Sequence, residues 1–455
     1  MKRSVKAMTT GLSSVQITEK YLSFFRARNH LELMSSPLAV PGNSTSFIIA
    51  GMQPLLPYLR GEQLPPAPRL TALQRCLRTD DVDMVGTNDY KFSGFHMLGN
   101  WSIGNYGKHE VIEMALDLLL NVFGLDLGRL WVTVFTGDPR LHLGLDEEAV
   151  AGWLRVGFPP ERIVPLGRDD NFWTTGGPGP SGPCSEIFVD RGPAYGCGSA
   201  ECRPGCSCGR FFEIWNLVFM EYDLLADGSI VPLPQRNIDT GMGLERIAMV
   251  LQGTGSAFAI DLFQAARERL QMLAPGSDRL DKTREEHAYK VIVDHMRAVL
   301  MAVLAGVEPG RDGSRSVIRR LVRRAARQGR ILGIDEQFLS SLLLPLAQAH
   351  GSLLTMEEHE RVPTVERIVA REERMFARVL TSGLKFLLQL EPKADGQVAG
   401  EELFRLSAEK GFPADLAAEV LMERGLSVDW SGYQRSVEEH RRVSRLSAEK
   451  HFRRG

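Results

Sequence analysis

Apolar residues follow two different patterns along the chain, one on each side of about residue 256. Before it, short apolar runs are separated by stretches rich in Gly and Pro, which is typical of strands mixed with helices. After it, apolar residues recur at the spacing of helix faces, with no strong strand signal. The pattern therefore predicts an α+β region over residues 1–256 and an all-α region over residues 257–455.

The same pattern predicts individual elements. Strands are expected at residues 130–135 (LWVTVF) and 211–222, and helices at residues 13–33, 109–123 and 243–251. Loops are expected at residues 35–46 and at residues 170–186. The second loop is predicted because Gly and Pro fill seven of the eight positions from 176 to 183.

The composition is that of an ordinary globular protein. Hydrophobic residues make up 44% and charged residues 24% of the 455 residues, and the formal net charge is −2. No apolar run approaches the roughly 18 residues of a membrane span, and the first 20 residues lack the apolar stretch of a secretory signal. We therefore expect a cytoplasmic location and no membrane contact, and a nucleic-acid partner would need a local basic face.

Four of the six cysteines lie within twelve residues, inside a glycine-rich stretch at residues 196–209. They are Cys197, Cys202, Cys206 and Cys208. In a reducing compartment such a cluster indicates metal rather than disulfides. Four thiolates suit a tetrahedral structural Zn²⁺ site with no open position for catalysis. The alternative is a flexible loop with free thiols.

Residues 311–330 hold eight arginines and one acid, on an otherwise nearly neutral chain. An apolar stripe at helical spacing predicts a helix here, and its arginines include Arg311, Arg319, Arg320, Arg323 and Arg324. Like charges three and four residues apart repel one another. A polyanionic partner explains them better than helix stability does, and we expect an RNA backbone.

Five segments of the chain, in order and spacing, resemble alanyl-tRNA synthetases of class II. They are residues 95–102 (FHMLGNWS), 179–188 (GPSGPCSEIF), 213–220 (EIWNLVFM), 239–246 (DTGMGLER) and 319–325 (RRLVRRA). The resemblance implies an antiparallel sheet flanked by helices, followed by a helical tRNA-recognition region. It implies activation of alanine by ATP with Mg²⁺, and transfer of the alanine to the acceptor end of tRNA. The family's editing and C-terminal domains have no counterpart in these residues, so we expect no editing in cis.

The resemblance also implies roles for single residues. Arg78 and Arg246 match the family's phosphate contacts, which suits a reaction that brings a carboxylate toward a phosphate, because arginine stays charged and binds phosphate through two donors. Asp239 matches the carboxylate that binds the amino group of alanine, although an Asp at this place can also cap the next helix. Gly241, Trp173, Asn216 and Val218 match the amino-acid pocket, and Met97 the adenine site; aromatic and apolar residues here can equally be packing.

The sequence departs from the family at three places. His96 stands where the family has Glu, and Tyr90 and Lys91 stand where it has Arg and His. Arg311 replaces the Asn that reads the wobble pair of the acceptor stem, while its partner Asp is kept as Asp415. Asn both donates and accepts, whereas Arg only donates, so we expect relaxed reading of that pair.

Three functions stay open on the sequence alone. The first is an alanine–tRNA ligase or a specialised paralogue. The second is an adenylating enzyme that passes alanine to a carrier protein or a small metabolite. The third is a non-catalytic RNA-binding protein, which the retention of Arg78, Asp239 and Arg246 argues against. The oligomeric state is not predicted.

Overall fold

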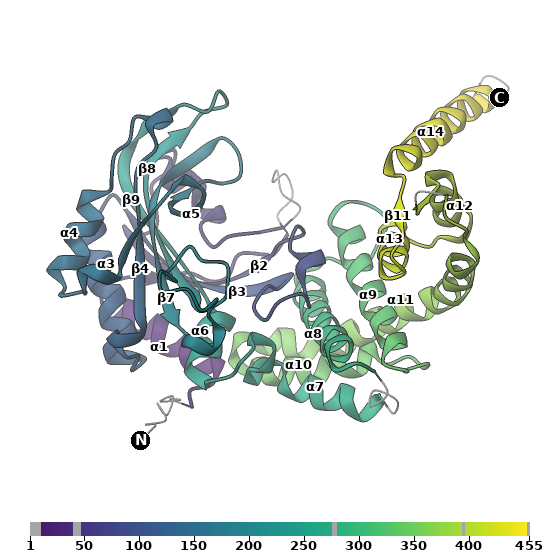
Figure 1. Cartoon of the computed structure of the whole chain (residues 1–455), viewed down its shortest axis with the longest axis horizontal. Helices are drawn as coiled ribbons and strands as arrows, with labels where there is room; N and C mark the ends of the chain where they lie inside the picture. Colours follow the sequence, from purple (N-terminus) through teal and green to yellow (C-terminus); the bar gives the residue numbers. More distant parts are fainter. Residues whose placement is uncertain (1–10, 40–46, 275–279, 394–395, 453–455) are drawn as a thin grey trace.

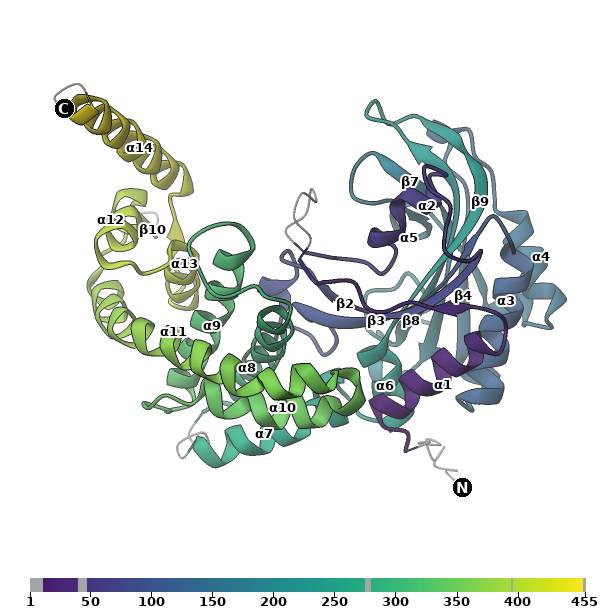
Figure 2. The ribbon, with the colours of Figure 1, turned by 180° about the vertical axis from the view of Figure 1, so that it is seen from behind.

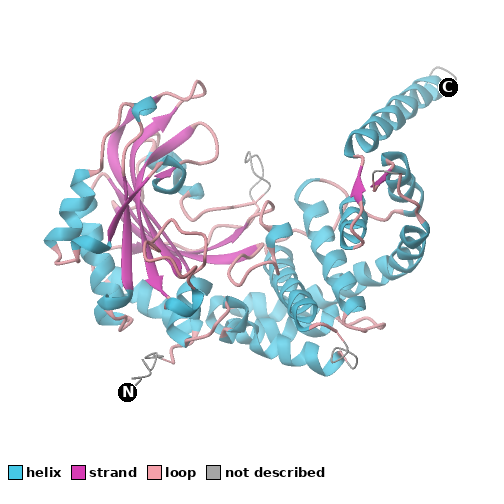
Figure 3. Cartoon of the chain, in the orientation of Figure 1, coloured by secondary structure: helices cyan, strands magenta, loops and turns pink. Residues whose placement is uncertain are grey.

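The computed structural model describes residues 11–39, 47–274, 280–393 and 396–452. The expected loop at residues 35–46 is described only up to residue 39, and the rest of it lies outside these ranges. A large sheet with helices packed on it forms the first part of the chain, and helices dominate after it (Figures 1 and 3). The predicted α+β class, with an antiparallel sheet and a helical C-terminal region, is confirmed.

Nine strands form the main sheet in the order β1-β2-β3-β9-β8-β7-β4-β5, with β6 paired to β7. Neighbouring strands are antiparallel except for the parallel pairs β1–β2 and β4–β5. The strands are β1 (Leu31–Glu32), β2 (Arg69–Leu77), β3 (Gly94–Ile103), β4 (Leu130–Phe135), β5 (Ile163–Leu166), β6 (Phe172–Trp173), β7 (Gly179–Asp190), β8 (Phe211–Leu224) and β9 (Ile230–Gly243). The predicted strands at 130–135 and 211–222 are therefore β4 and most of β8.

Helices cover one face of this sheet, and α1 runs along it (Figure 2). Ser13 begins α1 with a capping box, in which its side chain accepts from the Gln16 amide and the Gln16 side chain accepts from the Ser13 amide. The helices within the sheet region are α1 (Ser14–Arg26), α2 (Leu56–Leu59), α3 (Lys108–Asp117), α4 (Glu147–Arg155), α5 (Arg168–Asn171) and α6 (Leu244–Gln252).

The second part of the chain is helical apart from a two-stranded pair, β10 (Gln397–Val398) and β11 (Ser427–Val428). Its helices are α7 (Asp261–Leu273), α8 (Lys282–Leu304), α9 (Gly313–Ile331), α10 (Leu343–His350), α11 (Met356–Gln389), α12 (Gly400–Lys410), α13 (Ala414–Glu423) and α14 (Trp430–Phe452). α14 extends away from the other helices at the C-terminal end (Figure 1). Among the described helices, none has the length and apolar content needed to cross a membrane.

One hydrophobic core runs through both parts. Leu98 on β3, Ile247 on α6 and Ala298 on α8 are each fully buried members of the same apolar cluster. The cluster continues to Leu321 on α9 and Leu403 on α12. The change of pattern at residue 256 is thus a change of secondary structure within a continuous core.

The expected loop at residues 170–186 is partly wrong. Residues 174–178 lie between strands as expected, but the others belong to α5, β6 and most of β7. The register of β7 against β8 shifts between Ser181 and Cys184, so Gly182 and Pro183 sit at an irregularity where a missing donor is tolerated. A Cβ atom at Gly182 would lie 1.8 Å from the Phe219 carbonyl oxygen. Gly182 is therefore required because β7 and β8 approach each other closely, and it does not form a turn.

This close approach leads to a stability prediction. Gly182→Ala should lower the free energy of unfolding by about 3 kcal/mol or more, because β7 and β8 would have to move apart. Urea unfolding monitored by circular dichroism measures it. Gly177→Ala is the matched control, because a Cβ there has open space around it, and it should change stability by less than about 0.5 kcal/mol. Equal urea midpoints for Gly182→Ala and Gly177→Ala would contradict the close packing of β7 against β8 at Gly182.

Candidate active site

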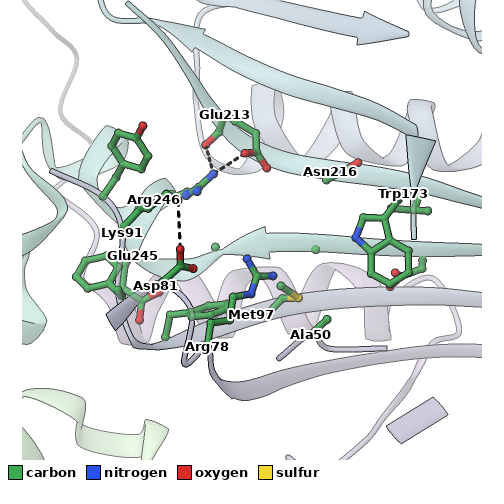
Figure 4. A pocket seen from close by; sticks show the side chains of 17 residues that line it. Ala50, Arg78, Asp81, Lys91, Met97, Trp173, Glu213, Asn216, Glu245 and Arg246 are labelled. Atoms are coloured by element: carbon green, nitrogen blue, oxygen red, sulfur yellow. Dashed lines mark hydrogen bonds and ion pairs between the residues drawn. The ribbon is translucent and has the colours of Figure 1, made fainter. Parts of the chain in front are cut away.

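A cavity of about 320 Å³ opens on the face of the sheet formed by β3, β9 and β8 (Figure 4). It brings together all eight residues that the sequence placed in the nucleotide and amino-acid sites. They are Arg78, Met97, Trp173, Asn216, Val218, Asp239, Gly241 and Arg246. Trp173 and Arg246 lie at opposite ends of the view in Figure 4.

Asp239 forms one end of the cavity. It pairs with Trp101 across β3 and β9, and the Trp101 Nε1–H donates to its Oδ1 over 2.6 Å. The Trp101 indole occupies the space above Gly99, where a Cβ would lie 2.4 Å from the ring. Asp239 is only 6% exposed, and this burial raises the pKa of its carboxyl group to about 7, although the Trp101 hydrogen bond opposes the shift. Among the described residues, this carboxyl group has no cation within ion-pair distance, so it favours a ligand that supplies one.

Arg246 forms the other end. Its guanidinium lies 2.6 Å from a Glu213 carboxylate oxygen, and it packs 5.5 Å from the centre of the Tyr90 ring. Asp239, Gly241 and Gly243 lie on one face of β9, because side chains alternate along a strand. Gly243 lies four positions after Asp239, which is about 13 Å along a strand. Arg246 follows in the first turn of α6. The cavity therefore runs along β9 from an anionic end to a cationic end.

A β-bulge brings Glu213 and Asn216 to the same wall. Glu213 pairs with Phe188 while Trp215 pairs with Ile187, so Ile214 is an extra residue in β8. Without it, residues 213 and 216 would point to opposite faces. Burial and the nearby Glu213 carboxylate raise the pKa of Glu186 to about 9, and Asn216 Nδ2 donates to Glu186 over 3.3 Å. Glu186 is therefore protonated at neutral pH and adds no negative charge to this wall.

Arg78 lies directly after β2, over the Phe95 ring at 4.9 Å, and its Nε donates to the Ile49 carbonyl over 3.0 Å. Met97 packs closely on the strands around it, since a Cβ at Gly241 would lie 3.0 Å from its sulfur. Gly241 thus makes room for Met97 against β9. Phe95 and Met97 alternate on the cavity face of β3, whereas His96 between them faces the other way.

Several lining residues were not predicted. They are Ala50, Asp81, Tyr90, Lys91, Phe92, Phe95, Glu213, Gly243 and Glu245. Period-two alternation from Met97 would have found Phe95, and alternation from Gly241 would have found Gly243. No sequence pattern indicated the Asp81–Lys91 ion pair of 3.2 Å, because both residues lie on the irregular connection between β2 and β3.

The departure from the family at His96 lies behind the site. His96 is fully buried, its Nδ1 lies 3.1 Å from Glu245, and its ring centre lies 5.4 Å from that of His350. Burial lowers the pKa of His96, so the ring is neutral at physiological pH. Arg297 also pairs with Glu245, over 2.5 Å. The substitution therefore lies in a buried polar cluster beneath Arg246, and it touches the cavity through Glu245.

The four clustered cysteines converge at the edge of the sheet region. Their sulfur atoms all lie within 4.8 Å of one another. Cys197 and Cys206 sulfurs are 3.8 Å apart, and those of Cys202 and Cys208 are 3.5 Å apart. A tetrahedral ion with Zn–S bonds of about 2.3 Å needs sulfurs about 3.8 Å apart. The geometry and the thiol donors both fit Zn²⁺.

The helix predicted over residues 311–330 is α9, and its apolar stripe is buried. The argument from unbalanced arginine charge is wrong, however, because carboxylates of this chain pair with most of the arginines. Arg319 and Arg323 lie 3.1 and 2.8 Å from Glu372. The other ion pairs are those of Arg320 with Asp83 and Asp415, Arg324 with Asp83 and Glu419, Arg327 with Glu423, and Arg330 with Asp335. The ion pairs of Arg320, Arg324 and Arg327 are linked to one another through Asp83 and Glu419, whereas Glu372 and Asp335 form separate groups.

Arg311 and Arg315 differ from these arginines. Both are exposed, just before α9 and in its first turn, and neither has an ion pair within the part of the chain that the structure describes. Asp415, by contrast, lies in the first turn of α13 and is bound to Arg320.

Comparison with known proteins places this geometry in a family. The family model described as tRNA synthetases class II (A) matches residues 16–454. An alanine–tRNA ligase of Thermoanaerobacter sp. (strain X514) is 40% identical over 439 residues, which cover 95% of this chain and 49% of that protein. One from Desulforamulus reducens is 41% identical over 445 residues, with the same coverage. The chain thus spans about half the length of the curated relatives it matches.

Among solved structures, a histidyl-tRNA synthetase of S. aureus matches 56% of this chain and 72% of its own, with 12% identity and a TM-score of 0.32. The family model, in contrast, covers almost the whole chain, including every segment that lines the cavity. The chain belongs to the class II (A) tRNA synthetases.

Proposed function

We propose that this chain activates alanine with ATP and transfers it to the 3′ end of tRNA, as an alanine–tRNA ligase or a specialised paralogue. One observation carries the proposal: a single cavity holds a buried, unpaired carboxyl group at one end and two arginines toward the other. An amino acid and a nucleoside triphosphate have the matching charges. The 40% identity to alanine–tRNA ligases supports alanine as the amino acid.

In the proposed adenylation, Asp239 binds the ammonium group of alanine, and Trp173, Asn216, Val218 and Gly241 surround the substrate. A carboxylate oxygen of alanine attacks the α-phosphorus of ATP. The bond from this phosphorus to the bridging oxygen breaks, and pyrophosphate leaves with the electron pair. Arg78 and Arg246 offset the negative charge that the two anions bring together, and Met97 and Phe95 offer apolar surface to the adenine.

Arg246 is paired with Glu213 in the structure. ATP phosphates would take over this arginine, which frees the Glu213 carboxylate. Mg²⁺ prefers carboxylate and phosphate oxygens, and Glu213 and Asp81 are the carboxylates on this side of the cavity that fit it. When bound, the metal ion supplies further positive charge to the phosphates.

Transfer to tRNA is the second proposed step, in which a hydroxyl of the terminal ribose attacks the alanyl carbonyl and AMP leaves. We propose residues 1–256 for the chemistry and residues 257–455 for tRNA recognition, through the acceptor stem. At α9, the exposed Arg311 and Arg315 are proposed to meet phosphates first, with the half-buried Arg319, Arg320 and Asp415 beside them. Arg323 and Arg324 are buried, so their proposed part is to support this surface from below. A cytoplasmic location belongs to the proposal, because ATP, alanine and tRNA meet there.

A second acceptor is supported by the same helix. Most of its arginines already have carboxylate partners, and Arg311 stands where the family reads the acceptor stem with Asn. Both features favour a carrier protein or a small metabolite as the acceptor of alanine. Transfer of labelled alanine to total tRNA distinguishes the two proposals, because both require the same adenylation.

We also propose that Cys197, Cys202, Cys206 and Cys208 bind a structural Zn²⁺. The fit of the four sulfur atoms supports it. Four protein ligands would close the coordination shell, so the ion would order the loop at residues 196–209 and take no part in the chemistry.

The adenylation site is tested by removing Arg246. Arg246→Ala should reduce alanine-dependent pyrophosphate exchange by about 100-fold or more, and Arg246→Lys should fall between it and the wild type, because Lys keeps the charge without the planar fork. Arg155→Ala is the control, since Arg155 is 63% exposed on α4 and outside the cavity. A folded Arg246→Ala variant with wild-type exchange would refute the assignment of the phosphate site.

The carboxyl group of Asp239 predicts a pH dependence. Its pKa of about 7 means that the binding form, the carboxylate, is lost below neutrality. The affinity for alanine should fall about tenfold per pH unit below pH 7 and be constant above it. Trp101→Phe removes the hydrogen bond that favours the carboxylate, so the midpoint should move to higher pH. Titrations of the wild type and this variant from pH 5.5 to 8.5 measure it, and a flat wild-type profile would contradict the binding role.

The zinc site is tested by metal analysis. The purified protein should contain about one zinc ion per chain. Cys206→Ser should lower both the zinc content and the melting temperature, because metal binding contributes to folding. Ser207→Ala in the same loop is the control and should change neither. Metal-free protein with four titratable thiols in this loop would reject the proposal.

A further inference from the structure

The connection between β2 and β3, residues 78–93, forms one wall of the cavity. Asp81, Tyr90 and Lys91 line the cavity from it, and Asn88 shapes it by accepting from the backbone amides of Tyr90 and Lys91 over 3.1 and 2.8 Å. It lies on the side of Arg78 and Arg246, where we place the nucleotide (Figure 4). Whatever fixes this connection also fixes the nucleotide end of the site.

One face of α8 holds the connection in place. Lys290 lies 2.7 Å from Asp89, and the Asp294 carboxylate accepts from the Ser93 amide over 3.0 Å. His287 packs on Gly86, where a Cβ would lie 2.7 Å from its ring. Residues 287, 290 and 294 recur at helical spacing, so they share one face. Gly86, Asp89 and Ser93 of the connection are thus held by buried or half-buried side chains of α8.

α9 contacts the connection through Asp83. The Asp83 carboxylate lies 2.9 Å from Arg320 and 2.5 Å from Arg324. Its side chain is 63% exposed, so solvent and solutes reach it. Arg324 has a second, more buried partner in Glu419. Arg320 has Asp415 as its other partner, which is 34% exposed.

Arg320 therefore differs from the other arginines of α9. Arg323 is bound to Glu372, which is only 5% exposed and cannot be reached by a solute. Arg320 instead bridges two accessible carboxylates, one on the cavity wall and one on α13. Exposed ion pairs of this kind contribute little, about 0.2–1 kcal/mol each. A phosphate that approaches α9 can replace them at low cost.

We propose that Arg320 couples the α9–α13 surface to the nucleotide end of the cavity, as a positioning residue that acts through Asp83. When RNA phosphates bind Arg320, they compete with Asp83, and the wall that carries Asp81, Tyr90 and Lys91 changes its position against ATP. The inference rests on the proposed function for the identity of the RNA. The contact chain itself is Arg320, Asp83 and the cavity wall.

Direct ATP binding by titration calorimetry tests the proposal without amino acid. Asp83→Asn and Arg320→Lys should each change the Kd for ATP by about two- to fivefold, the factor expected for one exposed ion pair. Lys keeps the positive charge of Arg320 but cannot bridge two carboxylates with a planar fork. The double variant should show no larger change than Asp83→Asn alone, because Asp83→Asn already removes the contact with Arg320, together with the one to Arg324.

The matched control is Arg330→Lys. Arg330 lies on the same helix, is 30% exposed and pairs with Asp335, which is 87% exposed and away from the cavity. This variant should bind ATP as the wild type does. Asp83→Glu, which keeps the carboxylate, should restore at least part of the wild-type Kd.

Unacylated tRNA serves as the polyanion probe. It should change the Kd for ATP of the wild type and of Arg330→Lys by a similar two- to fivefold factor, and leave that of Arg320→Lys unchanged. Wild-type ATP affinity in both Asp83→Asn and Arg320→Lys, or additive effects in the double variant, would overturn the coupling. Absence of alanine-dependent exchange in the wild type would instead overturn the proposed function, and the calorimetric comparison would still decide the coupling.

Discussion

The buried ion pair of Arg297 and Glu245 joins the parts of the molecule that the site depends on. Both side chains are about 0–1% exposed, and they lie 2.5 Å apart. Arg297 comes from α8 and also donates to the Gly94 carbonyl at the start of β3, while Glu245 accepts from the His96 amide and precedes Arg246. Loss of one partner would leave an uncompensated buried charge, which costs about 3–5 kcal/mol. Sheet, α6 and helical region are therefore fixed to one another beneath the cationic end of the cavity.

His96 changes the charge of this cluster. A Glu at this position, as in the family, would add a second carboxylate beside Glu245, with Arg297 as the cation between them. The buried neutral imidazole leaves Arg297 and Glu245 as a balanced pair. The substitution is thus compatible with a balanced buried cluster beneath the cavity.

Much of the site was predictable because strand geometry is regular. Side chains alternate along β9, so Asp239, Gly241 and Gly243 lie on one face of the strand. Their spacing in the sequence was therefore enough to predict that these three residues are neighbours in space. Prediction failed where the backbone departs from that regularity. The bulge at Ile214 reverses the faces of β8. The glycine and proline residues at 179–183 belong to β7, at a place where two strands approach closely.

The arginines of α9 show a different limit. Repulsion between neighbours on one helix can be read from the sequence, but the acids that offset it come from residues 83, 372, 415, 419 and 423. Their positions depend on how α11 and α13 pack against α9, which no local pattern contains. Counting charges over residues 311–330 therefore overestimated the number of arginines on α9 that are free to bind a polyanionic partner.

The pairing of β3 with β9 has a consequence for the order of folding. Trp101 meets Asp239, and Met97 meets Gly243, across about 140 residues of intervening chain. Closing so long a loop is slow relative to forming the hairpin of β8 and β9 or the local helices. The strands at the Asp239 end of the cavity come together only when this distant contact forms, so we expect this face of the cavity to be completed after the hairpin and the local helices.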